Sequence, residues 1–225
     1  MKRKLGAITI GQSPRDDVIP EMSQILGEDI EIIEAGALDG LTKEEISRFA
    51  PDEDDYILVS KLNDGTSVKF AEKHILPRLQ NCIEKLEEEG AELILFICTG
   101  AFPDIFKSNK LIVYPQQIFH GLVPELVGKG KLGIITPDRD QIGQSKSKWA
   151  ETGIKVEVVA GSPYGNEEEL IDAAMALKEM DVDLIVMDCI GYDMAMKKKV
   201  VEITTKPVVL ARTIVARVVG EILEV

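Results

Sequence analysis

Three segments of the chain recur in the same order, and this repetition constrains the fold more than any other feature of the sequence. The paired segments are residues 6–10 with 133–136, 13–16 with 136–140, and 92–100 with 183–191. Each match is weak by itself. Because all three keep their order, the sequence predicts two pseudo-symmetric lobes of similar topology.

Short apolar runs alternate with stretches whose apolar residues follow helical spacing. This alternation is typical of mainly parallel sheets flanked by helices, so we expect an α/β fold. Expected strands lie at residues 5–10, 31–34, 93–98, 111–114, 132–136, 155–159, 184–189 and 208–211. Expected helices lie at 13–26 (opened by Ser13-Pro14), 71–89, 115–127, 166–180 and 213–223, with shorter ones after the capping box of Thr42 and Glu45 and from Pro137.

The tripeptide Asn63-Asp64-Gly65 is a hairpin signal between two expected strands, and we predict a hairpin over residues 56–70. The second lobe has no corresponding segment, so the hairpin reads as an insertion in the first. No linker rich in Pro, Gly or Ser separates the lobes, which predicts close packing. We expect a first lobe of residues 1–115 with the C-terminal helix 213–225, and a second lobe of 116–211.

The charge balance narrows the choice of partners. With 26 basic and 39 acidic residues the formal net charge is −13. This charge disfavours binding to nucleic acid or to an anionic membrane, because both are negatively charged. No apolar run approaches the roughly 20 residues of a membrane helix. The three cysteines form no CxxC pair, so we expect reduced thiols and a cytoplasmic protein. The oligomeric state stays open, a homo-oligomer included.

Two cysteines are the candidate catalytic residues. Cys98 and Cys189 end equivalent apolar segments, and each precedes a glycine by two residues. Because the carboxyl ends of strands border the ligand site in open α/β sheets, the pair could face a cleft between the lobes. There one thiolate could remove a proton from carbon while the other thiol returns one. The alternative is that each is a small buried hydrophobe, as we expect for Cys82 on the apolar face of its helix.

The candidate ligand-binding residues follow the first strand of each lobe, the two cysteines and the last strand. Helix N-termini and arginines are natural partners of a carboxylate. The predicted substrate-binding residues are Gln12, Ser13, Arg15, Thr99, Gly100, Thr136, Gly191 and Arg212. Simple helix capping is the alternative for Ser13 and Thr136, and a surface position is the alternative for the two arginines.

Other signals lack the context that their chemistry requires. Residues 128–133 spell GxGxxG, but they lead into a strand instead of leaving one. The only histidines, His74 and His120, lie far apart in the sequence. A histidine-built metal site or a Ser-His-Asp triad is therefore not expected. The residues therefore give no signal for a metal site or a dinucleotide cofactor.

Residues 7–15, 186–192 and 207–223 resemble the AroM family, and the similarity extends along the whole chain. That family takes its name from association with aromatic (shikimate-pathway) genes. The paired lobes and cysteines are also similar to the wider aspartate/glutamate racemase superfamily, which includes hydantoin racemases, maleate isomerases and arylmalonate decarboxylases. This resemblance implies a racemase-like fold, no cofactor, and one cysteine on either side of a small carboxylic acid.

In that superfamily each cysteine is commonly followed by a threonine that helps to hold a carboxylate. Cys98-Thr99 fits the pattern, whereas Cys189-Ile190 departs from it, which argues against symmetrical racemisation. The expected function is a cofactor-independent isomerase, racemase or lyase that acts α to a carboxylate. The alternative is a non-catalytic protein that binds or senses a small acid of aromatic metabolism.

Overall fold

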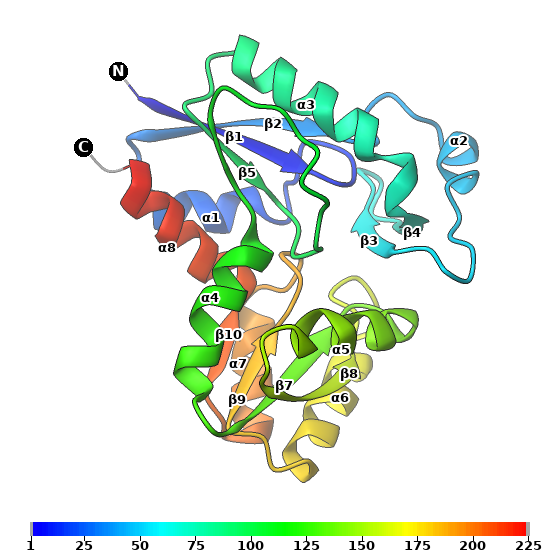
Figure 1. The fold of residues 1–225 in the computed structure, drawn as a ribbon, viewed down its shortest axis with the longest axis vertical. Coiled ribbons are helices and arrows are strands. Elements are labelled where there is room, and N and C mark those ends of the chain that lie inside the picture. Colours follow the sequence, from blue (N-terminus) through cyan, green and yellow to red (C-terminus); the bar gives the residue numbers. More distant parts are fainter. Residues whose placement is uncertain (1, 224–225) are drawn as a thin grey trace. The chain divides into compact units, whose positions relative to one another are not determined.

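The computed structural model describes residues 2–223. The chain divides into two compact units. The first comprises Met1–Pro115 and Ala216–Val225, and the second comprises Gln116–Val215. Each unit contains its own four-stranded parallel sheet with flanking helices (Figure 1). The protein therefore has the predicted α/β architecture.

The sheet of the first unit has the strand order β2-β1-β5-β6. Its strands are β1 (Arg3–Thr9), β2 (Ile30–Gly36), β5 (Leu93–Phe96) and β6 (Leu111–Val113). Its helices are α1 (Ile19–Leu26), α2 (Lys43–Ser47), the 3-10 turn η1 (Glu72–His74) and α3 (Leu76–Glu88). Helices α1 and α3 lie on opposite faces of this sheet (Figure 1).

The sheet of the second unit has the order β10-β9-β7-β8. Its strands are β7 (Lys131–Thr136), β8 (Lys155–Ala160), β9 (Leu184–Met187) and β10 (Val208–Leu210). The helical elements are α4 (Pro115–Val127), η2 (Arg139–Gln141), α5 (Ile142–Ala150), α6 (Glu167–Glu179), α7 (Met194–Thr204) and α8 (Ala211–Leu223). Helix α8 passes from the second unit back into the first.

The two sheets share one topology and one register. In both, the first strand lies between the second and the third, and the fourth lies beyond the third. Ile8 pairs with Phe96, and Ile135 pairs with Met187 at the equivalent place. The N–H of Ile97 donates to the carbonyl of Ile8 (2.7 Å), as that of Asp188 donates to Ile135 (3.0 Å). The paired segments 6–10 with 133–136 and 92–100 with 183–191 therefore occupy equivalent places in the two sheets.

One glycine in each central strand is required by close packing. A Cβ on Gly6 would lie 2.8 Å from the Ile94 side chain, and one on Gly133 would lie 3.1 Å from Leu177. These two glycines occupy the same position of the repeat. Their missing side chains let the chain around each strand pack closely, which explains why glycine recurs there.

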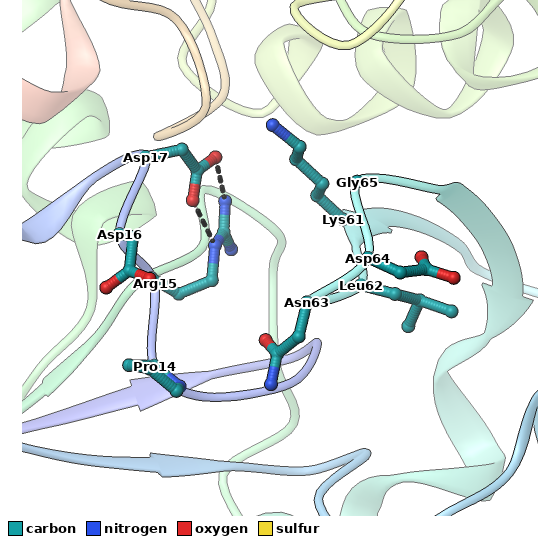
Figure 2. Close-up of a pocket in the computed structure, with 9 residues that line it drawn as sticks. All are labelled: Pro14, Arg15, Asp16, Asp17, Lys61, Leu62, Asn63, Asp64 and Gly65. Atoms are coloured by element: carbon teal, nitrogen blue, oxygen red, sulfur yellow. Dashed lines mark hydrogen bonds and ion pairs between the residues drawn. The ribbon is translucent and has the colours of Figure 1, made fainter.

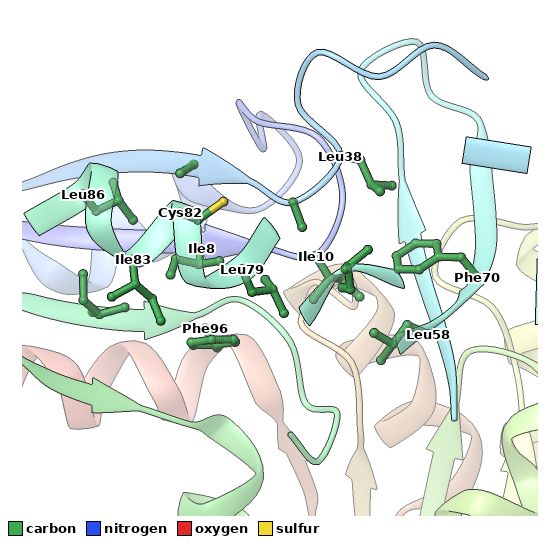
Figure 3. Packing of buried hydrophobic residues seen from close by; sticks show 14 of the residues in the cluster. Ile8, Ile10, Leu38, Leu58, Phe70, Leu79, Cys82, Ile83, Leu86 and Phe96 are labelled. Carbon is green, nitrogen blue, oxygen red and sulfur yellow. The ribbon is translucent and has the colours of Figure 1, made fainter. Parts of the chain in front are cut away.

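The core of the first unit lies between its sheet, α3 and a hairpin (Figure 3). Leu79, Ile83 and Leu86 of α3 pack in one cluster with Ile8 and Phe96, among other residues of the sheet. Cys82 belongs to this cluster and is buried, which confirms its prediction as a core residue. An equivalent cluster in the second unit joins its sheet to α6 and α7.

The predicted hairpin is present. Strands β3 (Ile57–Lys61) and β4 (Ser67–Ala71) form a separate antiparallel sheet, with Gly65 in the left-handed region at φ 87°. Within residues 116–215 the structure contains no antiparallel pair, so the hairpin occurs in the first unit alone. The capping box of Thr42 and Glu45 is also confirmed at the start of α2.

Three local predictions were wrong. Helix α1 begins at Ile19 rather than at Ser13, because the N–H and hydroxyl of Ser13 both bind the Asp39 carboxylate. The helix expected from Pro137 begins two residues later, because Asp138 caps η2, which continues directly into α5. The register aligns Thr136 with Thr9, so the proposed repetition of the Ser13 loop at Thr136 is not structural.

The helix expected over residues 71–89 is divided in two. The 3-10 turn η1 precedes α3, which begins at Leu76 with a proline in its first turn. Helix α7 was not predicted at all, although Asp193 caps it by accepting the N–H of Met196 (2.8 Å). Among residues 2–223, every helix is too short or too polar to span a lipid bilayer.

Candidate functional site

Cys98 follows β5 by two residues, at the carboxyl end of the first sheet. Its sulfur accepts the backbone N–H of Gly100 at 3.3 Å, and the side chain is half-buried. The tight turn is held further by Ala101, whose N–H donates to the Tyr56 hydroxyl (2.9 Å). Thr99 is buried between these residues. Cys98 is thus partly buried, and its sulfur lies close to a backbone donor.

Cys189 occupies the same position of the second repeat. It follows β9 by two residues, and its sulfur accepts the N–H of Gly191, also at 3.3 Å. It too is half-buried. The following Tyr192 is buried, and its hydroxyl donates to the carbonyl of Gly161 (2.6 Å), which ties this turn to the end of β8. The repeat therefore gives both thiols the same backbone contact.

The third cysteine differs from this pair. Burial raises the pKa of the Cys82 thiol to about 11, so at neutral pH it is a thiol inside a hydrophobic cluster. Cys98 and Cys189 are only partly buried, although each packs against the hydrophobic cluster of its unit. Because the thiolate is the reactive form, the three sulfurs should differ in chemistry.

We expect Cys98 and Cys189 to react with iodoacetamide at least tenfold faster than Cys82 at pH 7.5. The reason is that Cys82 is buried and its pKa of about 11 leaves little thiolate. Mass spectrometry of peptides from timed alkylation of the native protein measures the three rates. Equal rates, or alkylation that begins only in denaturant, would contradict this expectation.

Tyr164 is a site residue that the sequence analysis missed. It lies in the loop between β8 and α6, and its hydroxyl is 3.9 Å from the sulfur of Cys189. The ring packs against Gly191, where any side chain would collide with the Tyr164 hydroxyl. No sequence motif marks Tyr164, because its approach to Cys189 depends on how two separate loops pack.

Gln12 and Ser13 use their polar groups inside the protein. The Gln12 amide donates to the carbonyl of Leu41 (3.3 Å) and accepts the N–H of Asn63 (3.1 Å). Asp39 binds the N–H and the hydroxyl of Ser13 at 2.7 and 2.6 Å. These contacts fasten the loop after β1 to its neighbours. A direct role for Gln12 and Ser13 in ligand binding stays a prediction.

Arg15 is buried, with 4% of its surface exposed, so the surface position considered from sequence is wrong. Its guanidinium donates two hydrogen bonds to Asp17 (2.9 and 3.0 Å) and one to the hydroxyl of Thr9 (3.0 Å). Burial acts to raise the pKa of Asp17, but the contacts with Arg15 and the charge of Lys61 leave that pKa below its usual value. Arg15 lines a pocket (Figure 2).

In the second unit, Arg212 is also buried, with 2% exposed, which again excludes a surface position. Its guanidinium donates to the carbonyls of Ile190 and Gly191, each at 3.0 Å. Arg212 therefore supports the turn that carries Cys189. Thr136 is buried at the end of β7, where its hydroxyl lies 3.5 Å from the Gln141 side chain.

A buried ion pair lies next to Cys189, and the sequence analysis did not find it. The Asp188 carboxylate binds the Lys148 ammonium (2.7 Å) and the indole N–H of Trp149 (2.8 Å). The exposed fractions of the Lys148 and Asp188 side chains are only 9% and 3%. Nothing near Lys148 in the sequence marks this pair, because its partner lies 40 residues away.

Within residues 2–223, no three His, Cys, Asp or Glu side chains gather in a way that could hold a metal ion. The segment 128–133 leads into β7, as expected, so it is not a dinucleotide-binding loop. The chemically distinctive groups are therefore the two equivalent thiols, the buried arginines, Tyr164 and the Lys148–Asp188 pair.

Comparisons with solved structures identify the fold as aspartate/glutamate racemase-like. Aspartate racemase from Picrophilus torridus is similar with a TM-score of 0.59 and 13% identity, over 98% of this chain and 94% of that one. An unliganded arylmalonate decarboxylase gives 0.60 and 13%, over 99% and 92%. A mutant of the maleate cis-trans isomerase from Nocardia farcinica, with a covalently bound succinylcysteine intermediate, gives 0.64 and 13%, over 100% and 94%.

The chain belongs to the AroM family, whose model, described as AroM protein, matches residues 5–223. The resemblance stated from the sequence is thereby confirmed. No curated protein matches the sequence. At 13% identity the solved structures support the fold and leave the chemistry to be argued from the site itself.

Proposed function

We propose that this protein is a cofactor-independent isomerase, racemase or lyase, and that Cys98 and Cys189 perform acid/base chemistry α to a carboxylate of a small organic acid. What carries the proposal is that the position of the cysteine and its backbone contact recur in both units. Each thiol follows the strand beside the central one, is half-buried, and accepts an N–H at 3.3 Å from the glycine two residues later. If both cysteines were only hydrophobic core residues, there would be no physical reason for both sulfurs to accept the same backbone hydrogen bond.

The proposed chemistry is a proton transfer at carbon. One cysteine, as thiolate, takes the α-proton, so that the C–H bond breaks and an S–H bond forms. The electron pair left on carbon delocalises into the adjacent carboxylate, and the second cysteine, as thiol, returns a proton. In a lyase, loss of carbon dioxide supplies the carbanion instead. The succinylcysteine intermediate of the Nocardia farcinica enzyme is a precedent for cysteine chemistry on this fold.

The carboxylate needs partners that stabilise the extra charge of the intermediate. For this role we propose Thr99, Gly100 and Arg15 in the first unit, with Thr136, Gly191 and Arg212 in the second. Backbone N–H groups in the cysteine turns are suited to it, because they donate without reorganising. Gln12 and Ser13 contribute by holding the loop after β1 in place.

Tyr164 is proposed to stabilise the thiolate of Cys189, since its hydroxyl lies 3.9 Å from the sulfur. We expect Tyr164→Phe to raise the pKa of Cys189 and to slow its alkylation at pH 7.5 by about three- to tenfold, the effect of a weak hydrogen bond to a charged group. The pH dependence of iodoacetamide labelling at each cysteine measures this pKa. The pKa of Cys98 should not change, and a shift of similar size in both cysteines would point to a general structural effect.

The test of the function is α-proton exchange in heavy water. The purified protein is incubated with a panel of small carboxylic acids, and nuclear magnetic resonance follows loss of the α-proton signal. Exchange with loss of optical activity would identify a racemase, and exchange with retention would identify a one-sided reaction, as Ile190 in place of threonine suggests. Binding without exchange or decarboxylation across the panel would refute the enzyme and favour a binding protein.

A further inference from the structure

The segment that follows the cysteine differs between the two units. In the second unit, β9 and β10 are joined through α7, which begins at Met194, shortly after Cys189. In the first unit, the equivalent strands β5 and β6 are joined by residues 97–110, and these residues contain no helix. The turn that carries Cys98 therefore lacks the helix that follows Cys189.

Helix α7 supports the turn of the second unit. Its residue Val200 belongs to the same hydrophobic cluster as Tyr192, and Cys189 packs against that cluster. The N–H of Tyr192 donates to the carbonyl of Cys189 (3.4 Å), and the next residue, Asp193, caps α7. The turn after Cys189 thus leads directly into a regular element that is packed in the core.

In the first unit, helix α3 holds only the far end of the connecting segment. The Gln80 side chain accepts the N–H of Lys107 (2.9 Å) and donates to its carbonyl (3.0 Å). The Glu87 carboxylate accepts the N–H of Asn109 (2.8 Å). These contacts lie close to β6 in the chain, whereas Cys98 lies at the other end of the segment. The beginning of the segment therefore needs a different support.

The hairpin provides this support. Tyr56 immediately precedes β3, and its hydroxyl accepts the N–H of Ala101 at 2.9 Å. Two residues later, Leu58 packs so closely that a Cβ on Gly100 would lie 3.1 Å from its side chain. Residues two apart on a strand face the same side. One face of β3 therefore contacts two consecutive residues of the turn, and the N–H of the first of them donates to the sulfur of Cys98.

The hairpin is itself fixed to the rest of the first unit. Leu58 and Phe70 belong to the core cluster that joins the sheet to α3, and Cys98 packs against the same cluster (Figure 3). The Tyr56 carbonyl accepts the N–H of Glu72, the residue after β4 (2.9 Å). The Tyr56 hydroxyl is therefore presented by an anchored element, which allows it to hold a backbone N–H in place.

We propose that Tyr56 is a positioning residue for Cys98: through Ala101 it holds the turn in which the Gly100 N–H faces the sulfur. The hairpin thereby supplies, in the first unit, the support that α7 gives to the cysteine turn of the second. A donor that is already in place stabilises a thiolate without reorganising. The role of Cys98 as an acid or base rests on the proposed function, whereas the positioning of its turn does not.

The test is Tyr56→Phe, which keeps the ring and removes the acceptor. We expect the pKa of Cys98 to rise and its alkylation by iodoacetamide at pH 7.5 to slow by about three- to tenfold, with Cys189 unchanged. Amide hydrogen exchange at Ala101, followed by nuclear magnetic resonance, should become at least about tenfold faster, because this N–H loses its partner. Tyr164→Phe should give the opposite pattern at the two cysteines.

The control is Tyr114→Phe, which removes a hydroxyl from another tyrosine that packs on the same core cluster, with its ring centroid 4.9 Å from that of Phe96. It should leave the pH dependence of alkylation unchanged at both cysteines, and thermal unfolding should show that all variants are folded. The positioning role is refuted if Tyr56→Phe leaves the pKa of Cys98 unchanged or shifts both cysteines equally.

The same variants separate this role from the proposed function. A shift confined to Cys98, in a protein that exchanges no α-proton of any acid in the panel, would uphold the positioning role and refute the proposed chemistry. If the protein does catalyse exchange and Tyr56→Phe changes neither the exchange rate nor the pKa of Cys98, the chemistry stands and the positioning role is refuted.

Discussion

Cys98→Ser and Cys189→Ser should each lower the rate of α-proton exchange by roughly 10²- to 10⁴-fold, the usual contribution of a general acid or base. A serine hydroxyl is nearly isosteric with a thiol but is a far weaker base, so the fold should persist while the chemistry is lost. The rates are measured in heavy water with whichever acid of the panel exchanges. A one-sided reaction predicts a large loss for one cysteine and a smaller loss for the other.

Cys82→Ser is the matched control, because that thiol is buried and has a pKa of about 11. It should leave exchange nearly unchanged and should destabilise the protein, since it places a hydroxyl in an apolar cluster. Exchange that survives in the double variant of Cys98 and Cys189 would show that the two thiols are not the acid and base.

Lys148→Met should destabilise the protein by about 3–5 kcal/mol, as expected when one partner of a buried ion pair is removed. The Asp188 carboxylate would keep its contact with Trp149 but lose the cation 2.7 Å away in a site with almost no solvent. Urea unfolding followed by circular dichroism measures the free energy of unfolding.

Lys198→Met is the comparison for this second prediction. Lys198 and Glu202 form an exposed pair at 4.0 Å, and such pairs contribute roughly 0–1 kcal/mol. In the variant that also carries Asp188→Asn, much of the loss caused by Lys148→Met should be recovered, since no uncompensated charge remains. If Lys148→Met lowers the free energy of unfolding by less than about 1 kcal/mol, the prediction is wrong, and the Asp188 charge does not depend on Lys148 for stabilisation.

The fold was accessible from the sequence because local patterns and the tertiary structure agree. The buried strands are continuous apolar runs, the repeat preserves Gly6 and Gly133 where packing is closest, and the Asn63-Asp64-Gly65 turn forms as expected. The errors lie where a distant partner overrides a local signal. Ser13 looks like a helix cap, but Asp39, 26 residues later, takes its hydrogen-bonding groups.

The candidate site was harder to predict from the sequence, because its contacts also join residues that are distant in the chain. Cys98 and Cys189 could be selected as candidates because they lie at equivalent positions of the repeat, and the repeat is visible in this one sequence. Tyr164, Lys148 and Lys61 have ordinary neighbours in the sequence, and only the packing of loops brings them to a thiol, a buried aspartate or a pocket. The two arginines were proposed as ligand-binding residues because they lie near strand ends, but their burial was not predicted.

The path of α8 affects how the chain folds as it is synthesised. All four strands of the first sheet are complete at Val113, yet the part of α8 that belongs to this unit begins at Ala216. Val219 and Leu223 are buried there, and Leu26 of α1 lies next to Gly220. A ribosome therefore translates the entire second unit while this apolar surface of the first is still uncovered. A nascent chain that stalls before residue 216 therefore leaves this apolar surface exposed to chaperones and proteases.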